Sequence, residues 1–299
     1  MKGRLLIGFC LSLGFLACGT GNGTKEIITG FVLVKAGQFT MGSPLSEISR
    51  YEDESQHLVK LSRDFLMAKY DVTVREFHEF VLSSGYVTQA EKGKGGTVLV
   101  NGSQVDKTDA DWKNPYFRQS DSDPVVLVTW RDAVTYCNWR STKEGLHPAY
   151  SFQGPDVQWN QGANGYRLPT EAEWEFAARG GADGSKNYKT FPGSDKVDEV
   201  AWYSNNSEGR THPVGQKKPN ELGLYDMCGN AAQYCWDWLD AYPTVPQTDP
   251  IGGARGPFHV ARGGWWHLSA GRSRTALRGY HFEEKDCNSA LGFRLVRFQ

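Results

Sequence analysis

The sequence predicts an α+β fold with few helices and a large share of ordered irregular chain. Three helix starts carry capping signals, and no convincing helix pattern follows the last of them. The composition, with 34 Gly beside 10 Trp, 13 Tyr and 15 Phe, favours an aromatic, loop-rich globule over a helical bundle. No clean linker interrupts residues 31–299, so we expect a single domain.

The individual elements follow from local patterns. Two of the helix starts, at Thr73 and Thr170, show a Thr followed three residues later by Glu, which is a capping box. Strands are expected where apolar residues alternate or cluster between turn residues. In chain order we expect a hairpin at 31–43, a charged loop at 46–56, a strand at 65–68, a helix from Thr73 to about Gly85, an Asn-Gly hairpin at 97–105, helices from Thr129 and Thr170, the second ending at Gly180, and a terminal strand at 291–298.

The stretch 262–298 is the least regular part of the chain. Its middle carries Trp, Tyr, His, Phe and Arg among small residues, with neither the period of a strand nor that of a helix. Large aromatics and Arg among small adaptable residues are typical of a paratope. An ordinary loop with a few core aromatics has the same composition, so both interpretations remain open at this point.

The N-terminus has the pattern of an export signal. In residues 1–17 a basic start precedes an apolar stretch that is too short to span a bilayer. The residues up to Cys18 resemble a bacterial lipoprotein signal, in which this cysteine is lipidated, and residues 18–29 then form a flexible tether. An ordinary signal peptide with an incidental cysteine is the alternative.

These features limit the partners that we expect. A lipid anchor attaches a protein to a membrane without spanning it, and no later segment is apolar enough to span. The net charge of −1 creates no field that would attract nucleic acid.

The sequence contains no recognisable catalytic motif. Patterns for a nucleophile elbow, a phosphate loop, dinucleotide binding and a zinc protease are all missing. His267 and His281 lie in the C-terminal stretch without an indicated third ligand, and the cysteines fit no zinc spacing. Cys137 lies on the expected inner face of the second helix and is predicted to be a buried thiol.

Four longer motifs occur in a characteristic order. They are GYRLPTEAEWEFAARG at 165–180, PNELGLYDMCGN at 219–230, RGGWW at 262–266 and LGFR at 291–294. In order and spacing they resemble the formylglycine-generating-enzyme, or sulfatase-modifying-factor, family over about residues 30–298. The resemblance implies a variant of the C-type lectin fold, which is a compact α+β domain with little regular structure.

The same resemblance bears on enzyme activity. Members that oxidise a substrate cysteine to formylglycine use two copper-binding cysteines between the Gly-Gly and Leu-Gly-Phe-Arg motifs, where copper(I) requires soft thiolates. This sequence has only Cys287 in that stretch. We therefore expect a protein that is not an enzyme and requires no cofactor. A sulfatase-modifying-type oxidase or accessory enzyme domain is the alternative, and a merely structural envelope lipoprotein is a third interpretation.

The C-terminal stretch also resembles the variable region of proteins diversified by diversity-generating retroelements, as in the variable lipoproteins of Treponema. In such regions frame positions stay fixed, whereas variable positions change because template adenines are copied with errors. The frame positions here are Arg262, Gly263, Gly264, Trp266, Ala270, Arg274, Ala276, Arg278 and residues 291–294. The variable positions are Trp265, His267, Leu268, Ser269, Gly271, Arg272, Leu277, Gly279, Tyr280, His281 and Phe282. Each of them except Trp265 is reachable from an Asn codon by changing adenines.

The function implied is that of a ligand-binding lipoprotein displayed in the bacterial cell envelope, at the outer-membrane surface. The variable positions would face solvent and contact a protein or other macromolecular ligand that differs among variants. Frame residues such as Trp266, Ala270 and Ala276 would be buried instead. The residues alone do not identify the ligand.

The family resemblance also implies a structural calcium ion. Its ligands would be the side chains of Asp226 and Gln233 and the main-chain carbonyls of Gly229 and Ala231, which are oxygen donors of the kind that calcium prefers. Gln233 replaces the family's glutamate and so removes one negative charge.

Overall fold

The computed structural model describes residues 29–278 and 281–299, with the backbone alone for His281. The predictions for residues 1–28, including the signal and the lipidation of Cys18, lie outside the described residues. The same holds for the variable positions Gly279 and Tyr280. Among the described residues, no helix has both the length and the apolar character needed to cross a membrane.

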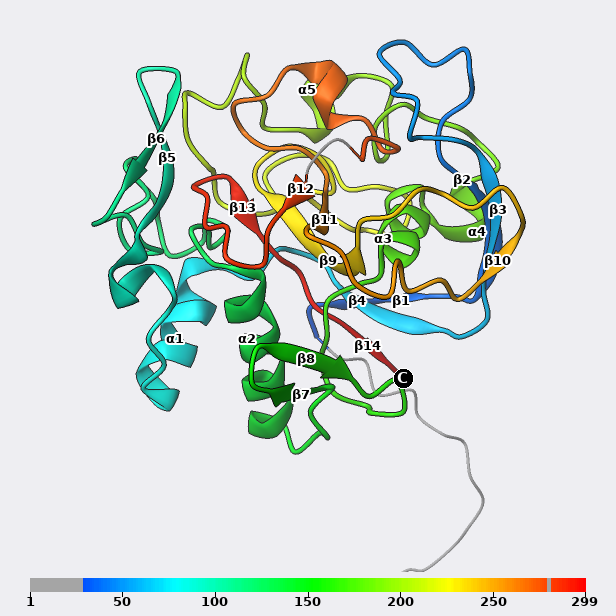
Figure 1. The fold of residues 1–299 in the computed structure, drawn as a ribbon. Helices are drawn as coiled ribbons and strands as arrows, with labels where there is room; N and C mark the ends of the chain where they lie inside the picture. The colour runs from blue at the N-terminus through cyan, green and yellow to red at the C-terminus, as the bar shows by residue number, and fades with distance from the viewer. Residues whose placement is uncertain (1–28, 279–280) are drawn as a thin grey trace, which may run out of the picture.

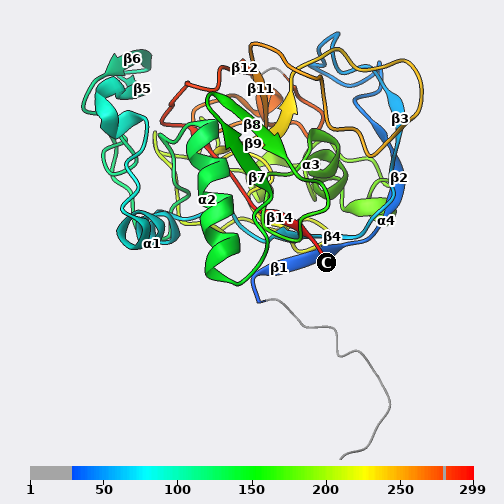
Figure 2. The same cartoon turned by 60° about the horizontal axis from the view of Figure 1, so that its bottom comes forward.

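The β structure of the described chain consists of three small sheets and two separate hairpins (Figures 1 and 2). The strands are β1 Phe31–Val34, β2 Gly37–Met41, β3 His57–Leu61, β4 Phe65–Ala68, β5 Gly96–Val100, β6 Ser103–Lys107, β7 Tyr150–Gln153, β8 Asp156–Trp159, β9 Ala232–Trp238, β10 Gln247–Thr248, β11 His259–Arg262, β12 His281–Phe282, β13 Leu291–Gly292 and β14 Val296–Phe298. The sheets have the orders β1-β4-β14, β10-β3-β2 and β12-β11-β9-β13, and the hairpins are β5-β6 and β7-β8.

The helices begin where the sequence predicts them. The longer ones are α1 Val74–Ser84, α2 Trp130–Lys143 and α3 Glu171–Ala178. Each has a complete capping box, in which the Thr side chain accepts from the third helical N–H and the acid at that position accepts from the Thr N–H. The shorter ones, which the sequence did not predict, are α4 Gly181–Gly184, α5 Val197–Val200, the π-helical turn η1 Ala90–Lys94 and the 3₁₀ turn η2 Ala270–Ser273.

Two predicted β elements are wrong because their strands pair with distant partners. β1 and β2 do not form a hairpin: β1 pairs with β4, and β2 pairs with β3. Asp64 stabilises the connection from β1 to β2, because its carboxylate accepts from the Lys35 ammonium at 2.6 Å and from the Ala36 N–H at 2.8 Å. The predicted terminal strand is likewise divided, because β13 pairs with β9 in one sheet and β14 with β4 in another.

Helix α3 positions the candidate site. All eight of its residues are buried, and it packs against β2, β9 and β11 (Figure 1). Glu171 and Glu175 lie four residues apart, so both carboxylates project from one side of the helix. That side faces the end of β11, where the C-terminal stretch begins.

Candidate functional site

The variable region starts with a turn that only glycine permits. Gly263 and Gly264 have φ of +98° and +69°, which side chains rarely allow. A Cβ on Gly264 would lie 2.5 Å from the carbonyl oxygen of Arg272. The loop therefore folds back tightly on itself, and these two frame positions are fixed by backbone geometry.

Arg262 anchors the start of this loop in the protein interior. Its side chain is fully buried, and it donates to the carboxylates of Glu171 and Glu175 at 2.6 Å each. It also donates to the Thr275 carbonyl at 2.8 Å, which ties the beginning of the loop to its later part. Burial alone would raise the pKa of Glu171, but the charges of Arg278 and Arg262 outweigh this effect and lower it to about 2.

Arg274 and Arg278 anchor the middle of the loop in the same way. Arg274 binds both oxygens of Glu54 at 2.8 and 2.7 Å and also pairs with Glu47. Arg278 binds both oxygens of Glu171 at 2.8 and 2.9 Å. Both arginines are nearly inaccessible to solvent. The frame arginines thus hold the loop through buried acids of the scaffold.

These acidic partners were not identified from the sequence, although one signal was available. Arginines at fixed positions of a compact fold need buried acids, because an unpaired buried charge is costly. Helix α3 offers Glu171 and Glu175 at the spacing that places them on one side. Glu47 and Glu54 lie within a charged loop about 220 residues away in sequence and carry no such signal.

The frame residues are buried as predicted, with one exception. Trp266 and Ala276 are at most 2% exposed, and the Trp266 indole donates to the Ser289 carbonyl at 3.2 Å. Ala270 is only half-buried and packs at the edge of the cluster around Phe191 and Tyr203. The difference arises because η2 lies on the surface of that cluster.

Two of the predicted solvent-facing variable residues are instead buried. Trp265 is 6% exposed and Leu277 is 2% exposed, and both belong to the main apolar cluster. The Trp265 indole donates to Nδ1 of His267 at 2.5 Å. The prediction of exposure was wrong at these positions because their side chains turn into the core and fill space there.

The other described variable side chains reach the surface to different degrees. Ser269 and Arg272 are exposed, whereas four others are half-buried: His267, Leu268, Gly271 and Phe282. Burial lowers the pKa of His267, so this imidazole is neutral at neutral pH. His281 pairs with Val260 through the backbone of β12. The variable positions therefore divide into a surface set and a buried pair.

The residues proposed for calcium do not fit a calcium ion as predicted. The side-chain oxygen of Gln233 already accepts from the Trp174 indole at 2.7 Å and from Arg294 at 2.6 Å. Its amide nitrogen donates to the Asp226 carbonyl at 2.7 Å. The buried guanidinium of Arg294 thus supplies the positive charge at this place, and Gln233 has no oxygen turned toward an ion.

The residues for a copper centre are also not assembled. Cys287 lies in a small apolar cluster with Leu127 and Val98, and burial raises the pKa of its thiol well above the usual value. The cysteines of the described chain are all buried and unpaired. No cluster of three His, Cys, Asp or Glu side chains suited to a metal occurs among the described residues.

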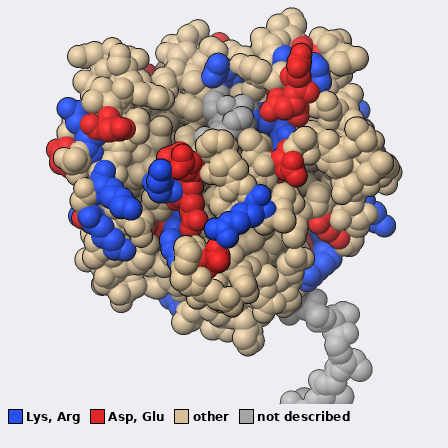
Figure 3. Space-filling view, in the orientation of Figure 1, with Lys and Arg blue, Asp and Glu red and all other residues tan. Residues whose placement is uncertain are grey.

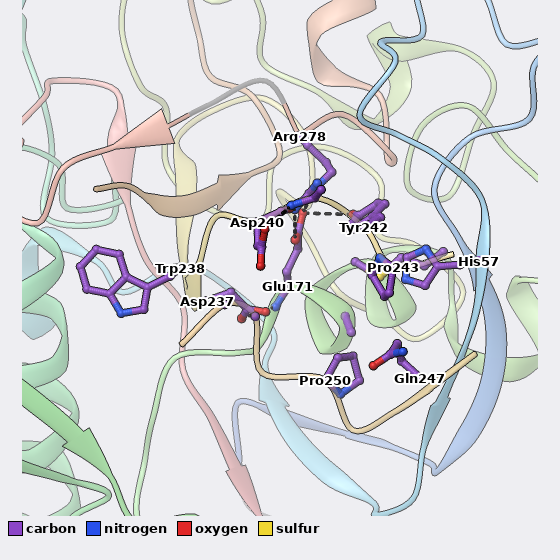
Figure 4. A pocket seen from close by; sticks show the side chains of 15 residues that line it. His57, Glu171, Asp237, Trp238, Asp240, Tyr242, Pro243, Gln247, Pro250 and Arg278 are labelled. Atoms are coloured by element: carbon purple, nitrogen blue, oxygen red, sulfur yellow. Dashed lines mark hydrogen bonds and ion pairs between the residues drawn. The ribbon is translucent and has the colours of Figure 1, made fainter. Parts of the chain in front are cut away.

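A cavity of about 240 Å³ adjoins the variable loop at Arg278 (Figure 4). Glu171, Arg278 and Tyr242 meet on one side of it, and His57, Gln247 and Pro250 line other parts. Glu171 is engaged by two arginines, and burial raises the pKa of the neighbouring Asp237. The charges of Glu171 and Arg278 in the wall thus neutralise each other within the protein, which suits an anchoring role. No motif in the sequence pointed to this cavity.

On the face shown in Figure 3, acidic and basic side chains are interspersed, and neither sign dominates. This distribution agrees with the near-zero net charge.

The fold and site together define a C-type lectin fold of the formylglycine-generating-enzyme type. Residues 20–299 match the model of the sulfatase-modifying factor enzyme 1-like domain, and the chain belongs to this family. It is 33% identical to the chaperone protein LppX of Paenibacillus barcinonensis over 95% of this chain and 94% of LppX. It is 31% identical to the formylglycine-generating enzyme of Streptomyces coelicolor over 89% of this chain and 88% of the enzyme.

Among solved structures, the Treponema denticola variable protein 1 is similar with a TM-score of 0.71 and 29% identity. The match covers 90% of this chain and 95% of that protein. The proteins to which this chain is similar are thus named as enzymes, as a chaperone and as a variable protein.

Proposed function

We propose that this chain is a surface-displayed binding lipoprotein whose loop at about 262–298 presents a diversifiable site for a protein or other macromolecular ligand. The observation that carries the proposal is the contrast among the arginines of the loop. Arg262, Arg274 and Arg278 are buried in ion pairs with the scaffold, whereas Arg272 between them is exposed. A loop whose backbone is held by its frame can tolerate changes at the positions that reach solvent.

The orientation of the domain supports display of this loop. In Figure 2, β1, which begins the described chain, lies at the lower edge of the molecule, whereas β11 and β12, which flank η2 in the chain, lie near the upper edge. A lipid on Cys18 would attach through the tether that precedes β1. The variable loop would then point away from the membrane.

Two experiments test the proposal. Full-length protein produced in a lipoprotein-processing bacterium should incorporate an alkyne-labelled fatty acid, and Cys18→Ala should abolish the label. A combined variant with Ser269→Ala and Arg272→Ala should keep the wild-type melting temperature, because exposed positions contribute little to stability. Loss of folding in that variant would count against a tolerant surface.

The alternative function is a sulfatase-modifying-type oxidase, which the relatives named formylglycine-generating enzymes favour. Such an activity would convert a cysteine-containing peptide to an aldehyde in the presence of copper(I) and oxygen. Because only Cys287 is available in the C-terminal stretch, we expect no aldehyde by hydrazide labelling. Aldehyde formation that is lost in Cys287→Ser would favour the enzyme instead.

A further inference from the structure

The loop between β2 and β3 exposes two aliphatic side chains to an unusual degree. Leu45 is 87% exposed and Ile48 is 86% exposed, more than any other large apolar residue of the described chain. The next is Leu82 on α1, at 71%. Tyr51 on the same loop is 42% exposed. The loop thus offers a small apolar patch to solvent.

This loop is rigidly attached to the scaffold. Glu54 is fully buried and accepts from the Ser43 hydroxyl at 2.7 Å and from both terminal nitrogens of Arg274. Arg274 also donates to the Ser49 carbonyl at 2.6 Å and pairs with Glu47. Burial would raise the pKa of Glu54, but the hydrogen bond from Arg274 helps to lower it, so the pair is ionised at neutral pH. The exposed side chains therefore project from a fixed backbone.

The same contacts place this loop directly beside the variable region. Arg274 is a frame residue of that region, two positions after the exposed Arg272. A Cβ on Gly271, a variable position, would lie 3.2 Å from the Ser49 hydroxyl oxygen. Figure 1 shows the blue loop near the orange segment at the same end of the molecule. Leu45 and Ile48 thus border the proposed ligand surface.

We propose that Leu45 and Ile48 form a constant apolar contact of the ligand surface, and that the occupant is a protein that also touches the variable positions. This inference rests on the proposed function. Apolar side chains at the centre or edge of a contact supply affinity, whereas the changeable polar residues beside them supply discrimination. A fixed contact would let successive variants retain basal affinity for protein surfaces.

A protein fits this patch better than a membrane does. In Figure 2 the loop between β2 and β3 lies at the upper edge of the molecule, whereas β1, through which a lipid anchor would be attached, lies at the lower edge. Bilayer insertion would require the protein to invert with respect to its own anchor. Two nearly fully exposed side chains also gain most by being covered with a broad apolar surface, which a protein provides.

The test uses full-length protein and a phage-displayed random peptide library as the probe. Clones selected on the wild type are measured against Leu45→Ser/Ile48→Ser, against Ser269→Ala/Arg272→Ala, and against Leu82→Ser as a matched exposed control. Some clones will bind in a way that depends on residues 269 and 272. We expect these clones to bind the Leu45→Ser/Ile48→Ser variant roughly tenfold or more weakly than the wild type, and to bind the Leu82→Ser control as tightly as the wild type. Ile48→Val, which keeps the apolar surface, should retain binding.

The two hypotheses fail in different ways. Clones that depend on residues 269 and 272 but bind the 45/48 variant normally would overturn the constant apolar contact and leave the proposed function intact. Clones that are indifferent to both pairs would count against the binding surface itself. Binding of anionic or neutral lipid vesicles that is lost in the 45/48 variant would assign the patch to a membrane and overturn the protein partner.

Discussion

Replacing Arg262 with Met tests whether buried ion pairs hold the variable loop. The change removes two contacts of 2.6 Å to Glu171 and Glu175 and one of 2.8 Å to the Thr275 carbonyl. The two acids keep Arg278 and Arg179 as partners. Removing one partner of a buried ion pair costs about 3–5 kcal/mol. The cost is expected here because two buried carboxylates lose a shared positive charge that Arg278 and Arg179 replace only in part.

Urea unfolding monitored by tryptophan fluorescence gives the measurement. With a slope of about 3 kcal/mol per molar urea, the expected loss lowers the midpoint by roughly 1–1.7 M. Arg272→Met is the matched control, since the same substitution at an exposed position should change stability by at most about 0.5 kcal/mol. Adding Glu175→Gln to Arg262→Met should recover part of the loss. Equal small effects of the two single variants would refute the division into frame and variable positions.

Three further outcomes follow from the structure. Leu277→Ala should lower the free energy of unfolding by about 2–5 kcal/mol, because the side chain is buried. Leu268→Ala, measured by thermal unfolding in the same way, should lower it clearly less. Similar losses for the two variants would mean that Leu277 faces solvent. Burial raises the pKa of Asp71 to about 8 against the charge of Arg294, with Asp226 adding to the rise. The folded state therefore holds a proton that the unfolded state has released, so stability should fall as pH rises from about 4 to about 8, by at most about 1.4 kcal/mol per pH unit. Asp71→Asn should flatten this slope, and an unchanged slope would exclude Asp71 as its source. Calcium chloride or a chelator should leave the melting temperature unchanged, because the side-chain oxygen of Gln233 already accepts hydrogen bonds from Trp174 and Arg294. A higher melting temperature with calcium would contradict this expectation.

Local signals in the sequence predicted local structure well. The capping boxes predicted at Thr73 and Thr170 each involve residues three apart, and both formed as the pattern requires. The helix start expected at Thr129 has a capping box as well. The hairpin at 97–105 formed around Asn101 and Gly102, both with positive φ. These elements depend on neighbours in the chain, so the sequence contains the needed information.

The errors concern contacts between distant residues. Whether β1 pairs with β2 or with β4 depends on partners that local patterns do not specify. Trp265 and Leu277 differ from their exposed neighbours only in the direction of their side chains, which the irregular backbone determines. The pairing of Arg274 with Glu54 across the chain became visible only in the folded structure.

Deep sequencing of codons 262–298 in a growing population tests the central claim most directly. The account predicts substitutions concentrated at the surface set of variable positions, such as Ser269 and Arg272, with the codons of Arg262, Arg274 and Arg278 unchanged. Uniform, low variation across these codons, or changes at the frame arginines as frequent as at the variable positions, would contradict a diversified binding site held by a fixed frame.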